Sequence, residues 1–259
     1  MVRSSTSPLS NSPRTVARLD IKGPNVIKGV QFEGLRVVGE PRKMAELYYE
    51  SGVQEILLVD TVASLYGRNH LSSLIHELVE QTFVPLTVGG GIRSIADARE
   101  ILAAGADKVA VNSAALSRPE LLHELANEFG SQCVVVSIQA AKQTNGWEAL
   151  SEGGRERSGR DALAWLEEAI YLGAGEALIT SVDKDGTGEG FDLPLAAIVD
   201  ASSTIPWMIS GGFGGLAHVD ELLSVSNPEG LAVGRAAHTE NITFGELRKF
   251  LDKRADARQ

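Results

Sequence analysis

The chain has 259 residues, of which 43% are hydrophobic and 22% are charged, and it carries a net charge of -10. This composition is typical of a globular protein and excludes collagen-like, disordered and disulfide-rich classes. The negative charge argues against nucleic acid or an anionic membrane as the main partner. No apolar run approaches the ~20 residues of a membrane helix. The single Cys133 has no partner for an internal disulfide, which favours a reducing, cytoplasmic location.

Residues 1–13 are polar and rich in serine and proline, without the apolar stretch of a signal peptide. We interpret them as a disordered N-terminal lead-in. The remaining residues, 14–259, have a length that suits one large domain.

Runs rich in valine, isoleucine and leucine alternate with stretches of helical length. Several of these stretches begin at a capping residue and end before a glycine, as helices do. The sequence predicts strands at Val16–Ile21, Glu55–Asp60, Val84–Val88, Lys108–Asn112, Cys133–Ile138, Glu176–Ser181, Trp207–Ser210 and Gly230–Gly234. It predicts helices at Pro41–Ser51, Asn69–Gln81, Ser94–Ala104, Arg118–Phe129, Asp161–Leu172, Leu193–Ala201, Leu216–Val225 and Thr243–Ala255.

Strands that each precede a helix predict a parallel sheet. Eight such units in about 245 residues predict an α/β fold of the (β/α)₈ TIM-barrel type. A doubly wound open sheet is the alternative. The glycines that end the third strand, Gly89–Gly91, do not form the G-x-G-x-x-G pattern of dinucleotide binding. We therefore expect no such cofactor, and the sequence indicates no metal site.

The two halves of the chain resemble each other. Residues at the ends of corresponding predicted strands match in order, at steps of 119 to 123 residues. The matched pairs are Asp20 with Gln139, Asp60 with Asp183, Gly90-Gly91 with Gly211-Gly212, and Asn112-Ser113 with Gly234-Arg235. Four pairs in the same order favour a barrel built from two similar (β/α)₄ halves.

Glycines at strand ends predict two phosphate sites. Backbone N–H groups approach an anion closely where side chains are absent, and helix N-termini add a favourable dipole. The loops after the seventh and eighth strands of TIM barrels commonly bind phosphate. The expected first cradle is Gly90, Gly91, Asn112 and Ser113, and the second is Gly211, Gly212, Gly234 and Arg235.

Both cradles are expected at the C-terminal end of the barrel, which we call the mouth. Two cradles at this end suit a substrate with two phosphates. Each Gly-Gly pair has a simpler explanation, a strand that turns into a helix, but two copies in matched positions favour the phosphate sites. Arg235 departs from the small or hydroxyl residues that such a cradle usually has. Its guanidinium would either hold a phosphate bidentately or crowd the cradle.

Carboxylates stand at predicted strand ends, where TIM barrels carry out chemistry. Asp20 interrupts an apolar strand, which is unfavourable for a carboxylate that is neither used nor paired. We predict that Asp20 is catalytic and that Lys28 pairs with it or with a phosphate. Asp183, Asp185 and Gly186 follow the sixth strand, where substrate contact and simple turn capping both remain open.

The repeat partner of Asp20 is Gln139. Two carboxylates would form a general acid/base couple. A glutamine cannot exchange protons at neutral pH and can only orient a substrate by hydrogen bonds. This position therefore decides which reaction the mouth can catalyse.

Charged residues also stand at the starts of four predicted strands: Arg14, Glu55, Lys108 and Glu176. Lys108 has the same parity as Asn112, so we expect both to point into the barrel. Two positive and two negative residues can pair in a closed ring, which makes them tolerable at the bottom of the core. From the residues alone, a salt-bridged plug or a solvent-exposed group is the favoured interpretation.

With these residues in view, the chain resembles the HisF family, the cyclase subunits of imidazole glycerol phosphate synthase. The resemblance spans Arg14 to about Leu251. The motifs that carry it are LDIK, VIKG, FEGLR, TVGGGI, GADKVAVNSAA, FGSQCVVVSI and GAGEALITSVDKDGT. It implies a duplicated half-barrel that binds a bisphosphorylated substrate and receives ammonia from a glutaminase docked on the N-terminal face.

The resemblance also implies a role for individual residues. Asp20 matches the catalytic acid/base, and Lys28 matches a loop lysine. The two cradles match the phosphate sites, although Arg235 is unusual there. The charged ring of Arg14, Glu55, Lys108 and Glu176 matches the gate of an ammonia passage, and Asp107 matches a residue at the interface with the glutaminase.

Gln139 departs from the cyclases, which have their second catalytic aspartate there. Together with the segment from Asp60 to Asn69, it resembles a paralogous branch, the WbuZ-like group, associated with amidation of sugars in surface polysaccharide synthesis. The resemblance thus favours an ammonia-handling synthase subunit for sugar amidation. Two alternatives remain: a true cyclase of histidine biosynthesis, and a non-catalytic scaffold that activates the glutaminase.

Overall fold

The computed structural model describes residues 12–61, 71–239 and 242–257. Within them, eight parallel strands form a closed barrel: they are paired in the order β10-β11-β12-β1-β4-β5-β6-β7, and β7 pairs in turn with β10. This closure excludes the doubly wound open sheet and confirms the predicted (β/α)₈ fold. The barrel strands are β1 Arg14–Lys22, β4 Glu55–Asp60, β5 Leu86–Gly89, β6 Lys108–Val111, β7 Val134–Gln143, β10 Glu176–Ser181, β11 Trp207–Ser210 and β12 Gly230–Val233.

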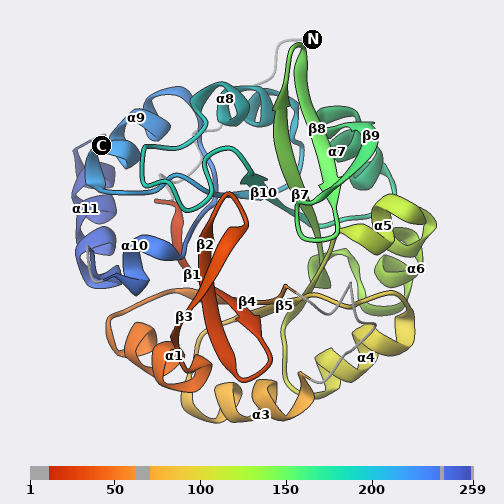
Figure 1. The fold of residues 1–259 in the computed structure, drawn as a ribbon, viewed down its shortest axis with the longest axis horizontal. Helices are drawn as coiled ribbons and strands as arrows, with labels where there is room; N and C mark the ends of the chain where they lie inside the picture. The colour runs from red at the N-terminus through yellow and green to blue at the C-terminus, as the bar shows by residue number, and fades with distance from the viewer. Residues whose placement is uncertain (1–11, 62–70, 240–241, 258–259) are drawn as a thin grey trace.

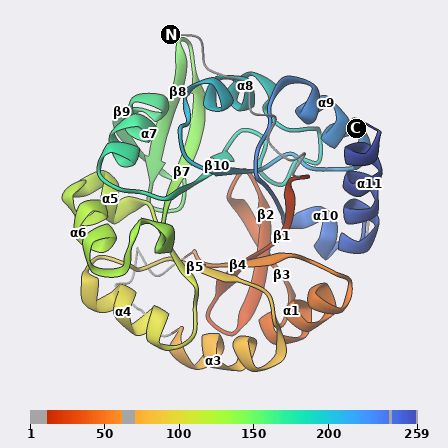
Figure 2. The same cartoon turned by 180° about the vertical axis from the view of Figure 1, so that it is seen from behind.

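Helices surround the strands in both views of the barrel (Figure 1 and Figure 2). Their caps follow from the sequence: Asp161 accepts hydrogen bonds from the backbone of Leu163 and Ala164, and Thr243 with Glu246 forms a capping box. The predicted start of the second helix at Asn69 lies outside the described residues. The outer helices are α1 Pro41–Glu50, α3 Ser72–Gln81, α4 Ile95–Ala103, α6 Glu120–Phe129, α7 Ala162–Tyr171, α8 Leu193–Ser202, α9 Leu216–Val225 and α11 Phe244–Asp256.

Six short elements were not expected from the sequence, and they too occur in matched positions of the two halves. After β1 come β2 Asn25–Val30 and β3 Glu33–Gly39, and after β7 come β8 Gly146–Ser151 and β9 Glu156–Asp161. Each pair of strands continues antiparallel from its barrel strand, and β2 with β3 crosses the barrel opening in Figure 1. The short helices α5 Ser113–Ser117 and α10 Arg235–His238 follow β6 and β12. The internal repeat therefore includes the loops of the mouth.

Some predicted boundaries were wrong. Cys133 belongs to a short 3₁₀ turn, Ser131–Cys133, and β7 then runs to Gln143, because it forms a hairpin with β8. At the N-terminus, Ser12 Oγ donates a hydrogen bond to the Leu251 carbonyl at 3.1 Å and Pro13 is buried. The rest of the predicted lead-in, residues 1–11, lies outside the described residues. No helix among the described residues is long and apolar enough to cross a membrane.

The inside of the barrel is arranged in layers along its axis. Side chains on a strand alternate between its two faces, so the residues two positions after the charged ring also point inward. An apolar layer lies there, between the charged ring and the carboxyl ends of the strands. Its members are Val16, Leu57, Ala110, Val135, Leu178, Met208 and Ala232.

Candidate active site and charged ring

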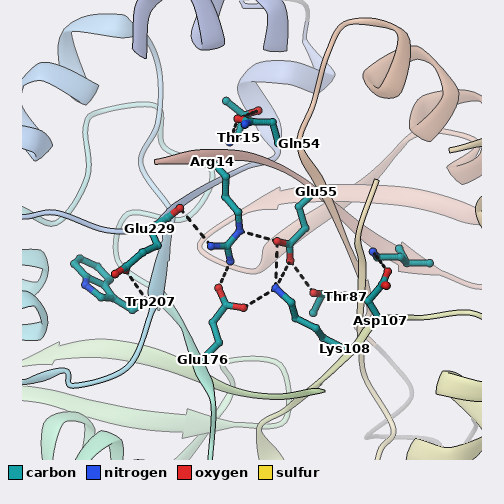
Figure 3. A network of polar contacts seen from close by, with 11 residues as sticks. Arg14, Thr15, Gln54, Glu55, Thr87, Asp107, Lys108, Glu176, Trp207 and Glu229 are labelled. Carbon is teal, nitrogen blue, oxygen red and sulfur yellow. Dashed lines mark hydrogen bonds and ion pairs between the residues drawn. The ribbon is translucent and has the colours of Figure 1, made fainter. Parts of the chain in front are cut away.

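The charged ring closes the N-terminal end of the barrel (Figure 3). Arg14 Nε lies 2.7 Å from Glu55 Oε2, and its Nη2 pairs with Glu176. Lys108 Nζ lies 2.7 Å from Glu176 Oε2 and 3.4 Å from both oxygens of Glu55. Thr87 Oγ1 donates to Glu55 Oε1 at 2.8 Å. Every member of the ring therefore touches two of the others with opposite charge.

Burial affects the ring unequally. The side chains of Glu55 and Glu176 are buried, whereas those of Arg14 and Lys108 are 24% and 20% exposed. Burial lowers the pKa of Lys108, while Glu55 opposes that shift. Asp107, the residue before Lys108 in the chain, is exposed, and its Oδ2 accepts a hydrogen bond from the Leu86 backbone at 2.8 Å.

A second set of charges, the buried ion cluster, lies on the far side of the apolar layer. It consists of Arg18, Asp20, Lys28 and Asp185. Asp20 accepts from Arg18 Nε at 2.8 Å and from Lys28 Nζ at 3.0 Å, and Lys28 Nζ also lies 3.1 Å from Asp185. Lys28 therefore pairs with both Asp20 and Asp185, whereas the sequence suggested Asp20 or a phosphate.

Asp20 is ionised in this cluster. Burial by itself raises the pKa of the Asp20 carboxyl, but the charges and hydrogen bonds of Arg18 and Lys28 outweigh it and hold the pKa well below its usual range. A carboxylate held in this way accepts a proton from a substrate only weakly. Its use as a general base requires a ligand that separates it from Arg18 or Lys28.

Arg18 was missed by the sequence analysis, although it shares its inward direction with Arg14 and Asp20 on β1. Its Nη1 donates to Thr180 Oγ1 and Ser210 Oγ, both at 3.0 Å, and its guanidinium carbon lies 5.8 Å from the Phe32 ring centre. The strand parity of Arg18 was the available signal, since it places a third charged residue of β1 inside the barrel.

The first cradle opens into a cavity of about 390 Å³ at the carboxyl ends of β4 to β7. Gly90 and Gly91 have φ values of +102° and +71°, and a Cβ on Gly90 would lie 2.3 Å from the Asp60 carbonyl. Asn112 Nδ2 donates to the Leu150 carbonyl at 3.0 Å, and Ser113 Oγ accepts from the Glu152 backbone at 2.9 Å. Glycine is therefore required at Gly90, and all four predicted members of the cradle line one cavity.

Gln139 borders the same cavity. It is 8% exposed, and among the described residues its Oε1 has no hydrogen-bond partner. Gln139 and Asp20 lie at matched positions on β7 and β1. Gln139 borders the cavity and has a covered side-chain oxygen without a partner among the described residues, whereas Asp20 is bound to two cations.

The second cradle is nearly filled. Gly211 and Gly212 have φ values of +96° and +95°, positive like those of the glycine pair in the first cradle. The space between them, Gly234 and Arg235 is only about 20 Å³. Arg235 Nη1 donates to the Gly186 carbonyl across this space. Arg235 thus lies across the cradle, and both outcomes expected for it, bidentate binding of a phosphate and crowding of the cradle, stay predictions.

The remaining predicted residues lie around the same mouth. Asp185 is buried in the ion cluster, and Gly186 has a φ of +70° with the Gly29 carbonyl 2.2 Å from where its Cβ would be. Asp183 is exposed and its Oδ2 accepts from the Lys142 backbone at 2.7 Å, so it links the loop after β10 to the end of β7. Among the described residues, no group of three or more histidine, cysteine, aspartate or glutamate side chains is placed to bind a metal ion.

Comparison with known proteins identifies the kinship of this barrel. Residues 14–243 match the family of histidine biosynthesis proteins. The imidazole glycerol phosphate synthase subunit HisF of Legionella pneumophila is 53% identical over 204 residues, which are 78% of this chain and 96% of the relative. The HisF subunit of Streptococcus sanguinis is 43% identical over 239 residues, 92% of this chain and 95% of the relative. The chain belongs to the HisF family.

Membership of the HisF family confirms the resemblance seen in the sequence, and the closed barrel agrees with it. The similarity to the WbuZ-like branch stays a prediction. The catalytic roles of Asp20, Lys28 and Gln139, the phosphate roles of the two cradles and the gate role of the charged ring also stay predictions, now with defined geometry.

Proposed function

We propose that this chain is the synthase subunit of a glutamine-dependent amidotransferase. A HisH-like glutaminase docks on the N-terminal face, and ammonia passes through the charged ring to the mouth. The charged ring carries this proposal, because four paired charges around the barrel axis form a closure that can open by exchange of partners. Lys108 is suited to exchange partners, since its contacts with Glu55 are 3.4 Å long while its contact with Glu176 is 2.7 Å, and its side chain, like that of Arg14, is partly exposed.

The apolar layer supports a path for neutral ammonia. Ala110 and Leu178 belong to this layer and also line the 390 Å³ cavity, so the layer is the floor of the cavity. Transfer of an ion across such a layer is far less favourable than transfer of a neutral molecule. Ammonia that crosses the ring would therefore reach the cavity in its nucleophilic, uncharged form.

Glutamine hydrolysis by the complex tests this proposal. We expect the chain to co-purify with a HisH-like glutaminase and to raise its turnover. Lys108→Met should reduce that stimulation without loss of binding, whereas Lys249→Met, on the exposed side of α11, should behave as wild type. If the mixed proteins show neither association nor raised turnover, the proposal is wrong.

For the acceptor, the mouth favours amidation of a sugar over imidazole ring closure. Gln139 is the observation on which this depends, because it replaces a group that could move a proton with one that cannot. The filled second cradle points the same way, since it leaves little room for a second phosphate. The amidated compound belongs on this view to nucleotide-sugar or surface-polysaccharide chemistry.

The second candidate is the cyclase reaction of imidazole glycerol phosphate synthase. It is favoured by the names of the relatives, which match 78% to 92% of this chain, and by the presence of Asp20 and Lys28 at the mouth. Expression in a bacterium that lacks its own HisF separates the two candidates. Growth without histidine would support the cyclase; no growth, with the protein shown to be produced and folded, would support amidation. A barrel that stimulates the glutaminase but consumes no ammonia would be the scaffold.

A further inference from the structure

The two cradles share a pair of glycines with positive φ but differ greatly in the space they leave. The glycine pairs Gly90-Gly91 and Gly211-Gly212 all have positive φ, yet the adjoining cavities measure about 390 Å³ and about 20 Å³. A space of ~10–15 Å³ holds one water molecule. The second cradle can therefore hold little more than a water, whereas the first lies within the ~300–1,000 Å³ of small-molecule sites.

Side chains close the second cradle. Arg235 occupies the position that matches Ser113, and its guanidinium reaches the Gly186 carbonyl. Lys28, which also lines that space, is bound to Asp20 and Asp185. The buried ion cluster contains two cations and two anions, so it offers no net positive charge to a second phosphate.

Two residues that line the first cavity have buried acceptors without donors. Gln139 Oε1 is buried without a partner among the described residues, and so is Asn112 Oδ1 on the neighbouring strand end. An unpaired buried acceptor is unfavourable, by roughly 1–3 kcal/mol, until a ligand or water donates to it. Arg18, Arg93 and Arg118 line the cavity together with Asp60 and Glu152. Arg18 is paired with Asp20 and Arg118 with Glu124. An anion in this cavity would therefore depend on the backbone N–H groups at the glycines rather than on an excess of positive charge.

We propose that the mouth binds one singly phosphorylated sugar, with its phosphate in the first cradle and with hydroxyl or amino donors directed at Gln139 and Asn112. Arg235 excludes a second phosphate and so determines specificity. This inference deepens the proposed function, since the sugar would be the acceptor of ammonia. It depends only on the carboxyl ends of the strands, however, and not on the charged ring.

Calorimetric titration of the chain alone tests this site, with ribulose 5-phosphate and ribulose 1,5-bisphosphate as probes. These compounds differ by one phosphate. We expect one ribulose 5-phosphate per chain and no more than threefold tighter binding of the bisphosphate. Arg235→Ser, which copies Ser113, should open the second cradle and tighten the bisphosphate about tenfold, as one added charge-assisted contact predicts. The dissociation constant of the monophosphate should stay within threefold of the wild-type value.

Gln139→Leu should weaken the binding of ribulose 5-phosphate about tenfold, because a hydroxyl of the sugar loses the side-chain oxygen to which it donates a hydrogen bond. The variant's circular dichroism and unfolding midpoint show whether it folds. Wild type that prefers the bisphosphate more than tenfold, or that binds neither compound, would overturn the proposal, as would Arg235→Ser without effect. Because no glutaminase is present, failure here leaves the stimulation test of the proposed function unaffected, and failure of that test leaves this one unaffected.

Discussion

Arg14 and Arg18 lie four residues apart on the same strand and point into the same barrel, yet they belong to two charge clusters with different properties. Each cluster has two cations and two anions. In the charged ring the cations are partly exposed, with Arg14 at 24% and Lys108 at 20%. In the buried ion cluster the side chains of Arg18 and Lys28 are 3% and 8% exposed.

Because of this difference in exposure, the ion pairs of the charged ring can separate more easily than those of the buried ion cluster. A partly exposed cation that leaves its partner is hydrated at once, whereas a fully buried one has only its protein partners. In the proposed function, the ring at the N-terminal end would therefore respond to a docked subunit. The cluster at the mouth instead holds Asp20 ionised and divides the two cradles.

The largest expected effect is the difference in stability loss when each of the two arginines is replaced. Arg18→Met removes a fully buried cation and leaves Asp20 with Lys28 alone, which should lower the free energy of unfolding by ~3–5 kcal/mol. Arg14→Met leaves Glu55 paired with Lys108 and Thr87, and should cost about 1–2 kcal/mol. Urea unfolding measures both. Equal losses for the two variants would mean that the clusters do not differ as described.

The next effect is a pH dependence next to the buried ion cluster. Burial, with the nearby charge of Lys28, lowers the pKa of His238 to about 4, and its Nδ1 shares a 2.6 Å hydrogen bond with the Tyr48 hydroxyl. Between pH 6.5 and 4 the unfolded chain takes up a proton that the folded chain refuses. The contribution of neutral His238 to the free energy of unfolding is therefore fully present above pH 6.5. It is lost as the pH falls from 6.5 to 4, by at most ~1.4 kcal/mol per pH unit.

Unfolding at several pH values, with two variants, checks this slope. His238→Gln should flatten it in that window even if it lowers stability at neutral pH. His123→Gln, on the exposed side of α6, should keep the slope of wild type. An unchanged slope in His238→Gln would show that other groups cause the loss.

The smallest expected effect is the stability loss when a buried hydroxyl is removed from each charge cluster. Thr87 donates to Glu55 in the ring, and Thr180 accepts from Arg18 in the cluster. Replacement of either by valine removes one hydrogen bond and leaves the ion pairs, so each should cost about 1 kcal/mol. The same unfolding assay should place the two variants within ~0.5 kcal/mol of each other. A loss above ~3 kcal/mol at Thr180 would mean that this hydroxyl, rather than Asp20, holds Arg18.

Most of the barrel could be predicted from the sequence because its strands are buried apolar runs with helices between them. The hairpins of β2 with β3 and β8 with β9 could not. All but the last residue of β3 are exposed, β2 and β3 have irregular register, and β9 reads ERSGRD without apolar alternation. β3 pairs with β2 and β9 pairs with β8, and these partner strands are not revealed by local sequence.

The candidate site was predicted as a set of positions but not as a set of partners. Strand ends and the repeat located Asp20, Gln139 and both cradles. The state of Asp20 depends on Arg18, which interrupts an apolar run and gave no motif. The extent to which Arg235 fills the second cradle depends on a backbone carbonyl, that of Gly186, and only the fold brings that carbonyl near it.

The central claim is that this mouth differs from that of a cyclase at Gln139. The most direct measurement is formation of imidazole glycerol phosphate from the cyclase substrate with an ammonium salt, in wild type and in Gln139→Asp. A positioned acid or base contributes roughly 10²–10⁴ in rate, and Gln139 supplies neither. We predict little or no product with wild type and a rise with Gln139→Asp, larger still when Arg235→Ser is added to admit the second phosphate. Wild-type turnover equal to that of the HisF relatives would contradict the account and assign this chain to histidine biosynthesis.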